Sequence, residues 1–424
     1  MKDDQNISQG YKPSPLGPIP EDWEVKRLGE IGSFSKGTGV PKDKIISEGY
    51  PCLTYGDLYT KYDFVIKNIK SFIDEETSKE SKEISAGDIC FAGSGETPED
   101  IGKCATYLEN HPAYAGGDIV ILSPENNINS LWLSYLLNSD IGGKQRYKFA
   151  QGFSIVHIYP DNLKQIQIPV PPLPEQQRIV SVLSFWDTAI EKQTALIEQL
   201  TLSKRGLMQQ LLTGKKRLKG FEGKWKKIKL GSIAECITRK NEEDNKNVVT
   251  ISAQRGFVVQ TDFFNKSVAS EILDNYYLVY KDEFCYNKSY SNGYPMGAIK
   301  RLKTFDKAVV TTLYICFKLK EKPQTNIDFF EQYCESGILN KELVKVANEG
   351  GRAHGLLNVT PDDFFNMHMN VPSFEEQTAI ASVLVNADKE IEIQKQKLTA
   401  MQAQKKGLMQ VLLTGKKRIK KQEE

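Results

Sequence analysis

The thirteen residues GLMQQLLTGKKRL, from Gly206 to Leu218, recur near the end of the chain as GLMQVLLTGKKRI, from Gly407 to Ile419. Each matched residue is displaced by 201 positions, and only two of the thirteen letters differ. Both copies end a run of helix-forming residues with a glycine and a cluster of cations. Glycine favours the left-handed backbone that stops a helix, and cations favour the negative end of a helix dipole. The chain is therefore predicted to contain two helices with the same ending.

The repetition extends beyond this ending. PPLPEQQRIVSVL (171–183) matches PSFEEQTAIASVL (372–384) at the same displacement. PEDWEVKRLGEI (20–31) matches EGKWKKIKLGSI (222–233) at a displacement of 202. The two bodies between these segments, each about 150 residues long, share little identity. A repeated frame with divergent inserts indicates two copies of one structural unit.

Each frame contains a stretch whose apolar residues follow alternating steps of four and three, from Ile179 to Leu211 and from Ile380 to Leu412. We call these two rows of residues the seams. Polar residues interrupt them at equivalent places, Gln193 and Lys204 in the first copy and Gln394 and Lys405 in the second. A spacing of 3.5 residues over four to five heptads is typical of a coiled coil. The letters alone allow parallel or antiparallel pairing, and a core helix packed on its own body is the alternative.

The composition indicates a globular protein of more than one domain, because 424 residues exceed the size of most single cores. Hydrophobic content of 40% and charged content of 26% are ordinary for a soluble protein. We expect a cytoplasmic protein, because no apolar run approaches the roughly 20 residues of a membrane span. The net charge of +2 requires any nucleic-acid contact to come from local patches. The seven scattered cysteines argue against a disulfide framework or a zinc site.

The repeated frame resembles that of the DNA-specificity subunits of type I restriction-modification systems. The resemblance covers Gly17 to about Lys421 and rests on PPLPEQ and PSFEEQ together with the doubled LLTGKKR. It implies an α+β fold in which two α/β target recognition domains are separated by two long helices that form an antiparallel coiled coil, with an internal pseudo-twofold repeat. The second copy departs from the first: Glu375 stands in the place of Pro174, and KGFEGKW lacks the IPEDW lettering. Equal packing at the two junctions is therefore not expected.

On this resemblance the chain divides into an N-terminal arm (1–19), a first target recognition domain (20–170), a first long helix (171–217), a second target recognition domain (218–371) and a second long helix with a basic tail (372–424). Each recognition domain would read one half of a bipartite asymmetric site on double-stranded DNA. The helices would set the spacing and dock methyltransferase subunits, two in number. The resemblance also implies restriction or translocase subunits as partners. It implies no membrane partner. S-adenosylmethionine, ATP and magnesium are expected on partner subunits, with no cofactor in this chain.

Polar, glycine-containing loops in both bodies are the candidate DNA contacts. Residues 86–103 and 280–297 read as a strand followed by such a loop, and residues 149–162 and 348–363 form a second pair. Their hydroxyls, amides and cations match what base edges and phosphates bind. The candidates are Ser94, Glu96, Thr97, Lys103, Gln151, Ser154, Arg255, Asn287, Lys288, Ser289, Tyr290, Arg352 and His354. Arg352 is the strongest single candidate. The alternative is a set of solvated turns and an ordinary surface arginine.

The sequence contains no complete catalytic motif. LLTGKKR lacks the glycine spacing of a phosphate loop, Ser94 lacks the G-x-S-x-G setting, and the four histidines show no H-E-x-x-H pattern. An Asn- or Asp-Pro-Pro-aromatic methyltransferase motif is absent. PED at 98–100 and PDD at 361–363 lack the second half of a nuclease site. We therefore expect a non-catalytic specificity subunit that directs partner adenine methyltransferase and endonuclease subunits. A coiled-coil structural adaptor without DNA recognition and a stand-alone nuclease are the alternatives.

Overall fold

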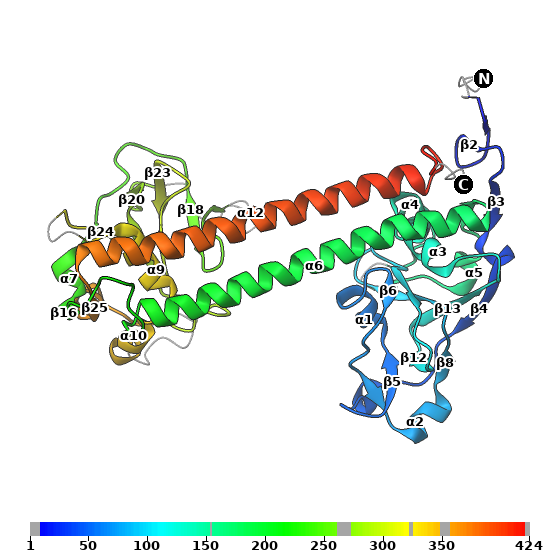
Figure 1. Ribbon diagram of the computed structural model, residues 1–424, viewed down its shortest axis with the longest axis horizontal. Coiled ribbons are helices and arrows are strands. Elements are labelled where there is room, and N and C mark those ends of the chain that lie inside the picture. Colours follow the sequence, from blue (N-terminus) through cyan, green and yellow to red (C-terminus); the bar gives the residue numbers. More distant parts are fainter. Residues whose placement is uncertain (1–8, 153–154, 261–272, 322–324, 348–356, 420–424) are drawn as a thin grey trace. The chain divides into compact units, whose positions relative to one another are not determined.

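The computed structural model describes residues 9–152, 155–260, 273–321, 325–347 and 357–419 (Figure 1). Contacts divide the chain into two compact units. Unit 1 comprises residues 1–193 and 397–424, and unit 2 comprises residues 194–396. Each unit therefore contains one variable body, together with a segment from each of two long helices.

Unit 1 is built on two sheets. Within its described residues, the larger sheet has the order β4 (Gly32–Lys36), β13 (Ile119–Pro124), β9 (Ile89–Ala92), β11 (Cys104–Tyr107) and β6 (Val65–Ile66). The smaller has the order β7 (Phe72–Ile73), β5 (Tyr50–Leu53), β12 (Ala113–Ala115) and β8 (Lys82–Ile84). Strand β9 is buried at every position, as expected for a continuous apolar run in the middle of a sheet.

Unit 1 also contains short strand pairs and short helices. Outside the two sheets, the described residues form three further strand pairs, all antiparallel: β1 (Tyr11–Lys12) with β2 (Ile19–Pro20), β3 (Glu24–Arg27) with β15 (Gln167–Val170), and β10 (Ser94–Gly95) with β14 (Val156–His157). The short helices are α1 (Tyr55–Thr60), α2 (Glu75–Glu80), α3 (Ser130–Leu137), α4 (Asp140–Lys148) and α5 (Pro160–Leu163), with 3-10 turns η1 (Leu28–Glu30) and η2 (Lys42–Lys44).

Unit 2 repeats the central part of unit 1. Its described residues form an antiparallel sheet in the order β17 (Ala234–Cys236), β24 (Ile315–Leu319), β21 (Phe284–Asn287) and β22 (Ala298–Arg301). The strand pairs are β16 (Lys226–Lys229) with β25 (His368–Val371), β18 (Val249–Ser252) with β19 (Gly256–Val259), and β20 (Tyr277–Tyr280) with β23 (Lys307–Val310). The short helices are α7 (Leu230–Ile233), α9 (Ile327–Glu335), α10 (Asn340–Val346) and α11 (Pro361–Asn366).

The two sheets have equivalent strand orders, because β4-β13-β9-β11 corresponds in sequence position to β17-β24-β21-β22. In both units the strand entering the candidate loop, β9 or β21, lies between the strand leaving it and a later strand. The short helix that follows the sheet, α3 or α9, also recurs. The repeat inferred from the frame therefore extends into bodies whose letters differ.

The long helices are α6 (Leu173–Leu211) and α12 (Phe374–Leu412), each of 39 residues. Each begins within three residues of the proline that opens its matched segment, as predicted. Every seam position is buried or half-buried in both helices. In unit 1, Ile179 and Leu183 of α6 and Met409 and Leu412 of α12 belong to one hydrophobic core, which also contains Trp132 of the body. The long helices therefore supply part of the hydrophobic core of the unit.

Unit 2 makes the same arrangement with the helices exchanged. Met208 and Leu211, near the end of α6, share a core with Ile380 and Leu384, near the start of α12. Stacked and edge-on aromatic rings of the body, including Phe284 and Phe317 at 5.5 Å between centroids, fill the remainder. Since α6 packs against both bodies, the alternative of a helix buried only on its own body is wrong.

The lysines that interrupt the seams pair across the helices. Lys405 of α12 contacts Asp187 of α6 in unit 1, and Lys204 of α6 lies 2.5 Å from Asp388 of α12 in unit 2. Both members of one pair are displaced by 201 positions from those of the other. In unit 1 the beginning of α6 packs against the end of α12, and in unit 2 the end of α6 packs against the beginning of α12. The pairing within each unit is therefore antiparallel, and the predicted pseudo-twofold repeat is confirmed.

The junctions beside the helix starts differ between units. In unit 1, Glu175 is 2% exposed, accepts a hydrogen bond from the Trp23 indole at 3.0 Å and pairs with Arg418 at 2.5 Å. Arg418 also binds both carboxylate oxygens of Asp22 at 2.8 Å. The hydrogen bonds with Glu175 and then with Asp22 raise the pKa of Arg418, and the hydrogen bond with Arg418 lowers the pKa of Asp22. The tail after α12 is thereby tied to the N-terminal frame.

In unit 2 only part of this junction is present. Arg217 binds Glu376 through two hydrogen bonds of 2.5 and 2.6 Å, but Lys224 stands in the place of Asp22. Among the described atoms the indole nitrogen of Trp225 has no hydrogen-bond partner. The cations after each helix therefore serve as ion-pair partners of the other long helix, and the two junctions are packed unequally, as the sequence led us to expect.

Replacing the glycine after each long helix by alanine should have unequal effects. Gly214 and Gly415 adopt φ values of +69° and +71°, which an alanine adopts at a cost of about 1 kcal/mol. A Cβ on Gly214 would lie 3.4 Å from Trp225, whereas on Gly415 it would lie 2.6 Å from Pro20. We expect Gly214→Ala to destabilise unit 2 by about 1 kcal/mol and Gly415→Ala to destabilise unit 1 by about 2–4 kcal/mol. Urea unfolding of both variants measures the difference, and equal costs would show that the contact with Pro20 relaxes freely.

Candidate nucleic-acid interface

The loop between β9 and β11 presents three of the predicted contacts at or near the surface of unit 1. Glu96 and Thr97 are exposed, and the Thr97 hydroxyl donates to Asp100 at 3.0 Å. Lys103 is half-buried, with its Nζ 3.7 Å from a carboxylate oxygen of Asp63. The loop therefore offers a carboxylate, a hydroxyl and an ammonium group, which are the types that base edges and phosphates bind.

Ser94 has a different setting, because it is 4% exposed. Its hydroxyl lies 3.0 Å from Nδ1 of His157, its direct cross-strand partner. Gln151 is exposed and exchanges two backbone hydrogen bonds with the same histidine, of 3.0 and 2.7 Å. The structure thus brings Ser94 and Gln151 together around His157, a neighbour that the sequence did not indicate. Ser154 lies outside the described residues.

The corresponding loop of unit 2 runs from Asn287 to Gly297. The Asn287 side chain donates to the carbonyl of Ile251 at 3.1 Å and accepts from the N–H of Ser289 at 3.0 Å, which fixes the start of the loop. Lys288 and Ser289 are half-buried. Tyr290 is 67% exposed, so its ring and hydroxyl are accessible to a partner.

The turn between β18 and β19 lies beside this loop. Gln254 donates a hydrogen bond of 3.0 Å to the carbonyl of Asn292, and the neighbouring Arg255 is exposed. The structure therefore places Arg255 near the loop that carries Asn287 to Tyr290, although the two are more than thirty residues apart in sequence. Arg352 and His354, the candidates of the last loop, lie outside the described residues and stay predictions.

A second group of cations and aromatic rings in unit 2 was not selected from the sequence. The guanidinium of Arg239 lies 3.6 Å from the ring centroid of Tyr280, and Lys307 lies 5.2 Å from the same ring. Both cations are already paired with carboxylates, Arg239 with Glu283 at 2.6 Å and Lys307 with Glu243 at 2.7 Å. This pairing neutralises the group, so it is a weaker candidate for phosphate binding than the loops.

Two buried cations under the candidate loops also escaped the sequence analysis. Arg146 of α4 is 5% exposed, and its burial lowers the pKa of its guanidinium. Lys300 of β22 is 9% exposed. No local pattern distinguishes either residue from a surface cation, because both make nonlocal contacts. Arg146 donates to the carbonyl of Gly102, and Lys300 pairs with Glu335 of the later helix α9.

The described part of the chain contains no cluster of three or more His, Cys, Asp or Glu side chains placed to hold a metal ion. Its helices also include none with the length and apolar character needed to cross a membrane. Each unit has a polar loop that joins equivalent strands of an equivalent sheet, β9 to β11 in unit 1 and β21 to β22 in unit 2.

Comparison with known proteins identifies the class of this protein. Residues 20–202 match the family model described as the type I restriction modification DNA specificity domain. The chain is 30% identical to the putative type I restriction enzyme MjaX specificity subunit of Methanocaldococcus jannaschii, across 97% of both chains. It is 26% identical to the MjaVIII specificity subunit of the same organism, across 95% of this chain and 94% of the relative.

A solved structure has the same fold. The type I restriction-modification S subunit from M. genitalium superimposes with a TM-score of 0.55 at 17% identity, over 97% of this chain and 98% of the other. The chain belongs to the family of type I restriction enzyme specificity subunits. The resemblance stated from the sequence, the fold class and the assignment as a specificity component rather than a catalytic subunit are therefore confirmed.

Proposed function

We propose that each unit reads one half of a bipartite, asymmetric site on double-stranded DNA. The observation that carries this proposal is the equivalent strand order of the two sheets combined with unlike loops at the same edge: residues 94–103 in one and 287–297 in the other. Equivalent frames can approach a duplex in equivalent orientations, because the duplex backbone has local twofold symmetry. Different loop side chains then select different bases, so the two halves of the site differ in sequence.

The two long helices set the distance between the half-sites in this proposal and dock two methyltransferase subunits. Exposed apolar side chains support a docking role: Phe185 is 73% exposed on α6 of unit 1, and Leu202 and Ile393 are 63% and 56% exposed in unit 2. Large apolar residues on a helix surface are typical of protein interfaces. Restriction or translocase subunits would join the same assembly.

The remaining assignments follow from this role. The target recognition domains are residues 20–170 and 218–371, the long-helix segments are 171–217 and 372–424, and residues 1–19 form an N-terminal arm. S-adenosylmethionine, ATP and magnesium bind the partner subunits, which perform adenine methylation and any cleavage. The assembly acts in the cytoplasm, where the chromosome lies.

Duplex binding by the assembled methyltransferase complex tests the proposal. Phosphate contacts release counterions, so six or more of them should weaken binding by roughly 10³ or more between 50 and 200 mM salt. Cognate DNA should also compete better than random duplex at either salt concentration. A structural adaptor would give no dependence of duplex binding on this chain, and that outcome would remove the DNA-recognition role. A nuclease would cut DNA as the purified single chain with magnesium.

A further inference from the structure

Helices α3 and α9 occupy equivalent places and are tied at their starts to the long helices. Asn129 and Asn326 cap them, each accepting a backbone hydrogen bond within the first turn. The N–H of Asn129 donates to Gln176 of α6 at 2.8 Å, and that of Asn326 donates to Gln377 of α12 at 3.0 Å. Both glutamines are nearly fully buried, so these contacts are shielded from water. Each short helix is therefore anchored to the first turns of a long one.

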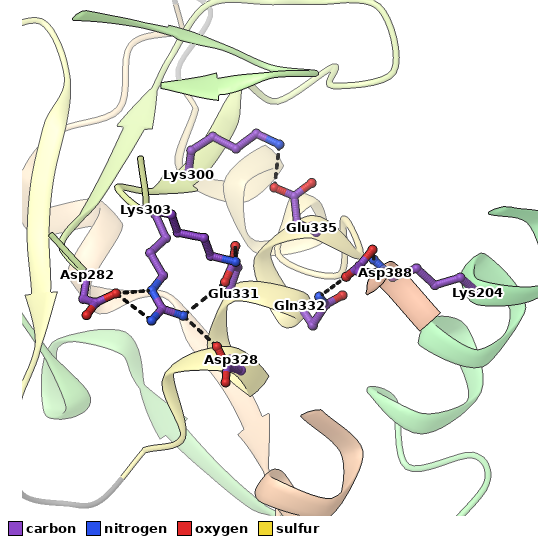
Figure 2. Close-up of polar contacts among 10 residues, drawn as sticks. Lys204, Asp282, Lys300, Lys303, Asp328, Glu331, Gln332, Glu335 and Asp388 are labelled. Atoms are coloured by element: carbon purple, nitrogen blue, oxygen red, sulfur yellow. Dashed lines mark hydrogen bonds and ion pairs between the residues drawn. The ribbon is translucent and has the colours of Figure 1, made fainter. Parts of the chain in front are cut away.

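The middle of each short helix contacts the cross-helix ion pair. The Tyr135 hydroxyl of α3 donates to Asp187, and Nε2 of Gln332 in α9 donates to Asp388 at 2.6 Å (Figure 2). These two aspartates are the ones that receive the seam lysines from the opposite long helix. Unlike side chains at equivalent positions thus make equivalent contacts in both units.

The end of α3 holds the returning end of the candidate loop of unit 1. The Asn138 side chain accepts a hydrogen bond of 3.2 Å from the N–H of Cys104, and it donates one of 2.6 Å to the carbonyl of the same residue. Buried Arg146 donates to Asn138 at 3.2 Å and to the carbonyl of Gly102 at 2.7 Å. Gly102 and Cys104 are the points at which the loop enters β11, so α3 fixes where the loop ends.

The end of α9 does the same in unit 2 through charged groups. Glu335 accepts from Lys300 at 2.5 Å and from the Tyr294 hydroxyl at 2.9 Å (Figure 2 shows the pair with Lys300). Lys300 donates to the same hydroxyl at 3.2 Å and lies 4.6 Å from the Tyr294 ring centroid. Burial alone would lower the pKa of Lys300, but Glu335 and Tyr294 more than offset it, and the pKa is raised. Tyr294 lies inside the loop, so Glu335 and Lys300 contact a residue of the loop directly.

We propose that Asn138 and Glu335 are positioning residues for DNA recognition, each holding one recognition loop in its reading conformation and connecting that loop through α3 or α9 to the long helices. The inference rests on the proposed reading of one half-site by each unit. Neither side chain contacts DNA in this account. Each acts on the backbone or on a tyrosine of the loop, so its loss changes the precision of reading more than the attraction to DNA.

Methylation by the assembled complex separates this role from a purely structural one. The measured quantity is discrimination: the rate on the cognate duplex divided by the rate on a duplex with one changed base pair, taken for each half-site. Glu335→Gln should lower discrimination about tenfold in one half only, and Asn138→Ala about tenfold in the other half only, because a misplaced loop loses directional base contacts. Lost discrimination in opposite halves is an outcome that general destabilisation would not produce.

Glu331→Gln is the matched control. Glu331 lies on the same helix, one turn before Glu335, and pairs with Lys303 at 2.6 Å (Figure 2). It also lies 3.3 Å from Arg301, and both of these cations follow the loop in the chain and lie outside it. It should leave discrimination in both halves unchanged. Tyr294→Phe keeps the ring and removes only the hydroxyl, so it should lower discrimination in the same half-site as Glu335→Gln. If the Glu335→Gln chain does not fold, Tyr294→Phe tests the role of this contact in its place.

Equal losses in both halves, or unchanged discrimination in folded Glu335→Gln, Tyr294→Phe and Asn138→Ala complexes, would overturn the inference. A wild-type complex that methylates no split site would instead contradict the proposed function. The wild-type measurement therefore distinguishes the two failures.

Discussion

A chain with seven additional residues in each long helix should direct methylation to a site whose unread gap is about three base pairs longer. One heptad adds about 10 Å of helix, and B-DNA rises about 3.4 Å per base pair. Duplicating residues 194–200 of α6 and residues 395–401 of α12 adds equivalent heptads and continues both seams, since Ile197, Leu200, Leu398 and Met401 are seam residues. In the sequence, both duplicated segments begin within two residues of the boundaries between the two units.

The readout is sequencing of methylated adenines in cells that contain the altered chain and its methyltransferase partner. Because the duplex turns about a third of a turn over three base pairs, we expect weaker methylation of the new site than of the original one. Insertion into α6 alone should abolish methylation, since the added heptad would have no partner. A gap of unchanged length with both helices extended would show that the helices do not set the spacing.

Reversing the charge of Asp187 should strongly destabilise unit 1. Lys405 is 7% exposed at its side chain, and its ammonium also lies 4.0 Å from the ring centroid of Phe64. Burial lowers the pKa of Lys405, and Asp187 offsets only part of this effect. Breaking a buried ion pair costs about 3–5 kcal/mol, so Asp187→Lys, which also adds a like charge, should cost at least about 3 kcal/mol.

Asp388→Lys in unit 2 is the matched comparison. Lys204 and Asp388 form the equivalent pair, but their side chains are 14% and 45% exposed, so water screens it. We expect a cost of about 1–2 kcal/mol. Hydrogen exchange of α3 and α9 amides in urea reports on the two units separately. Exchanging the charges, Asp187→Lys with Lys405→Asp, should recover part of the loss. No recovery would assign the effect to packing instead of charge.

The long helices could be predicted because their signals are local and repeated. A 3.5-residue spacing, a glycine at the end and a proline at the start each depend on residues close together in the chain. Their agreement in two copies fixed the seams correctly, including the polar interruptions. The seam lysines could not be assigned partners, because Asp187 and Asp388 face them only after the helices pair.

The bodies were less predictable because their contacts are nonlocal. Ser94 reads as part of an accessible polar loop, yet it is buried against His157, more than sixty residues away. Lys300 reads as a surface cation in a short strand, and its burial depends on Glu335 of a later helix. Asn138 in one unit and Glu335 in the other make equivalent contacts. Because the two residues differ, the sequence repeat does not reveal that their positions are equivalent.

Sequencing of methylated adenines, with and without this chain, tests the central claim most directly. Cells with the methyltransferase partner and the intact chain should carry methylation at one asymmetric motif of two short halves separated by a fixed unread gap. Deleting the chain should erase it. A continuous motif, or methylation that persists after the deletion, would contradict the account.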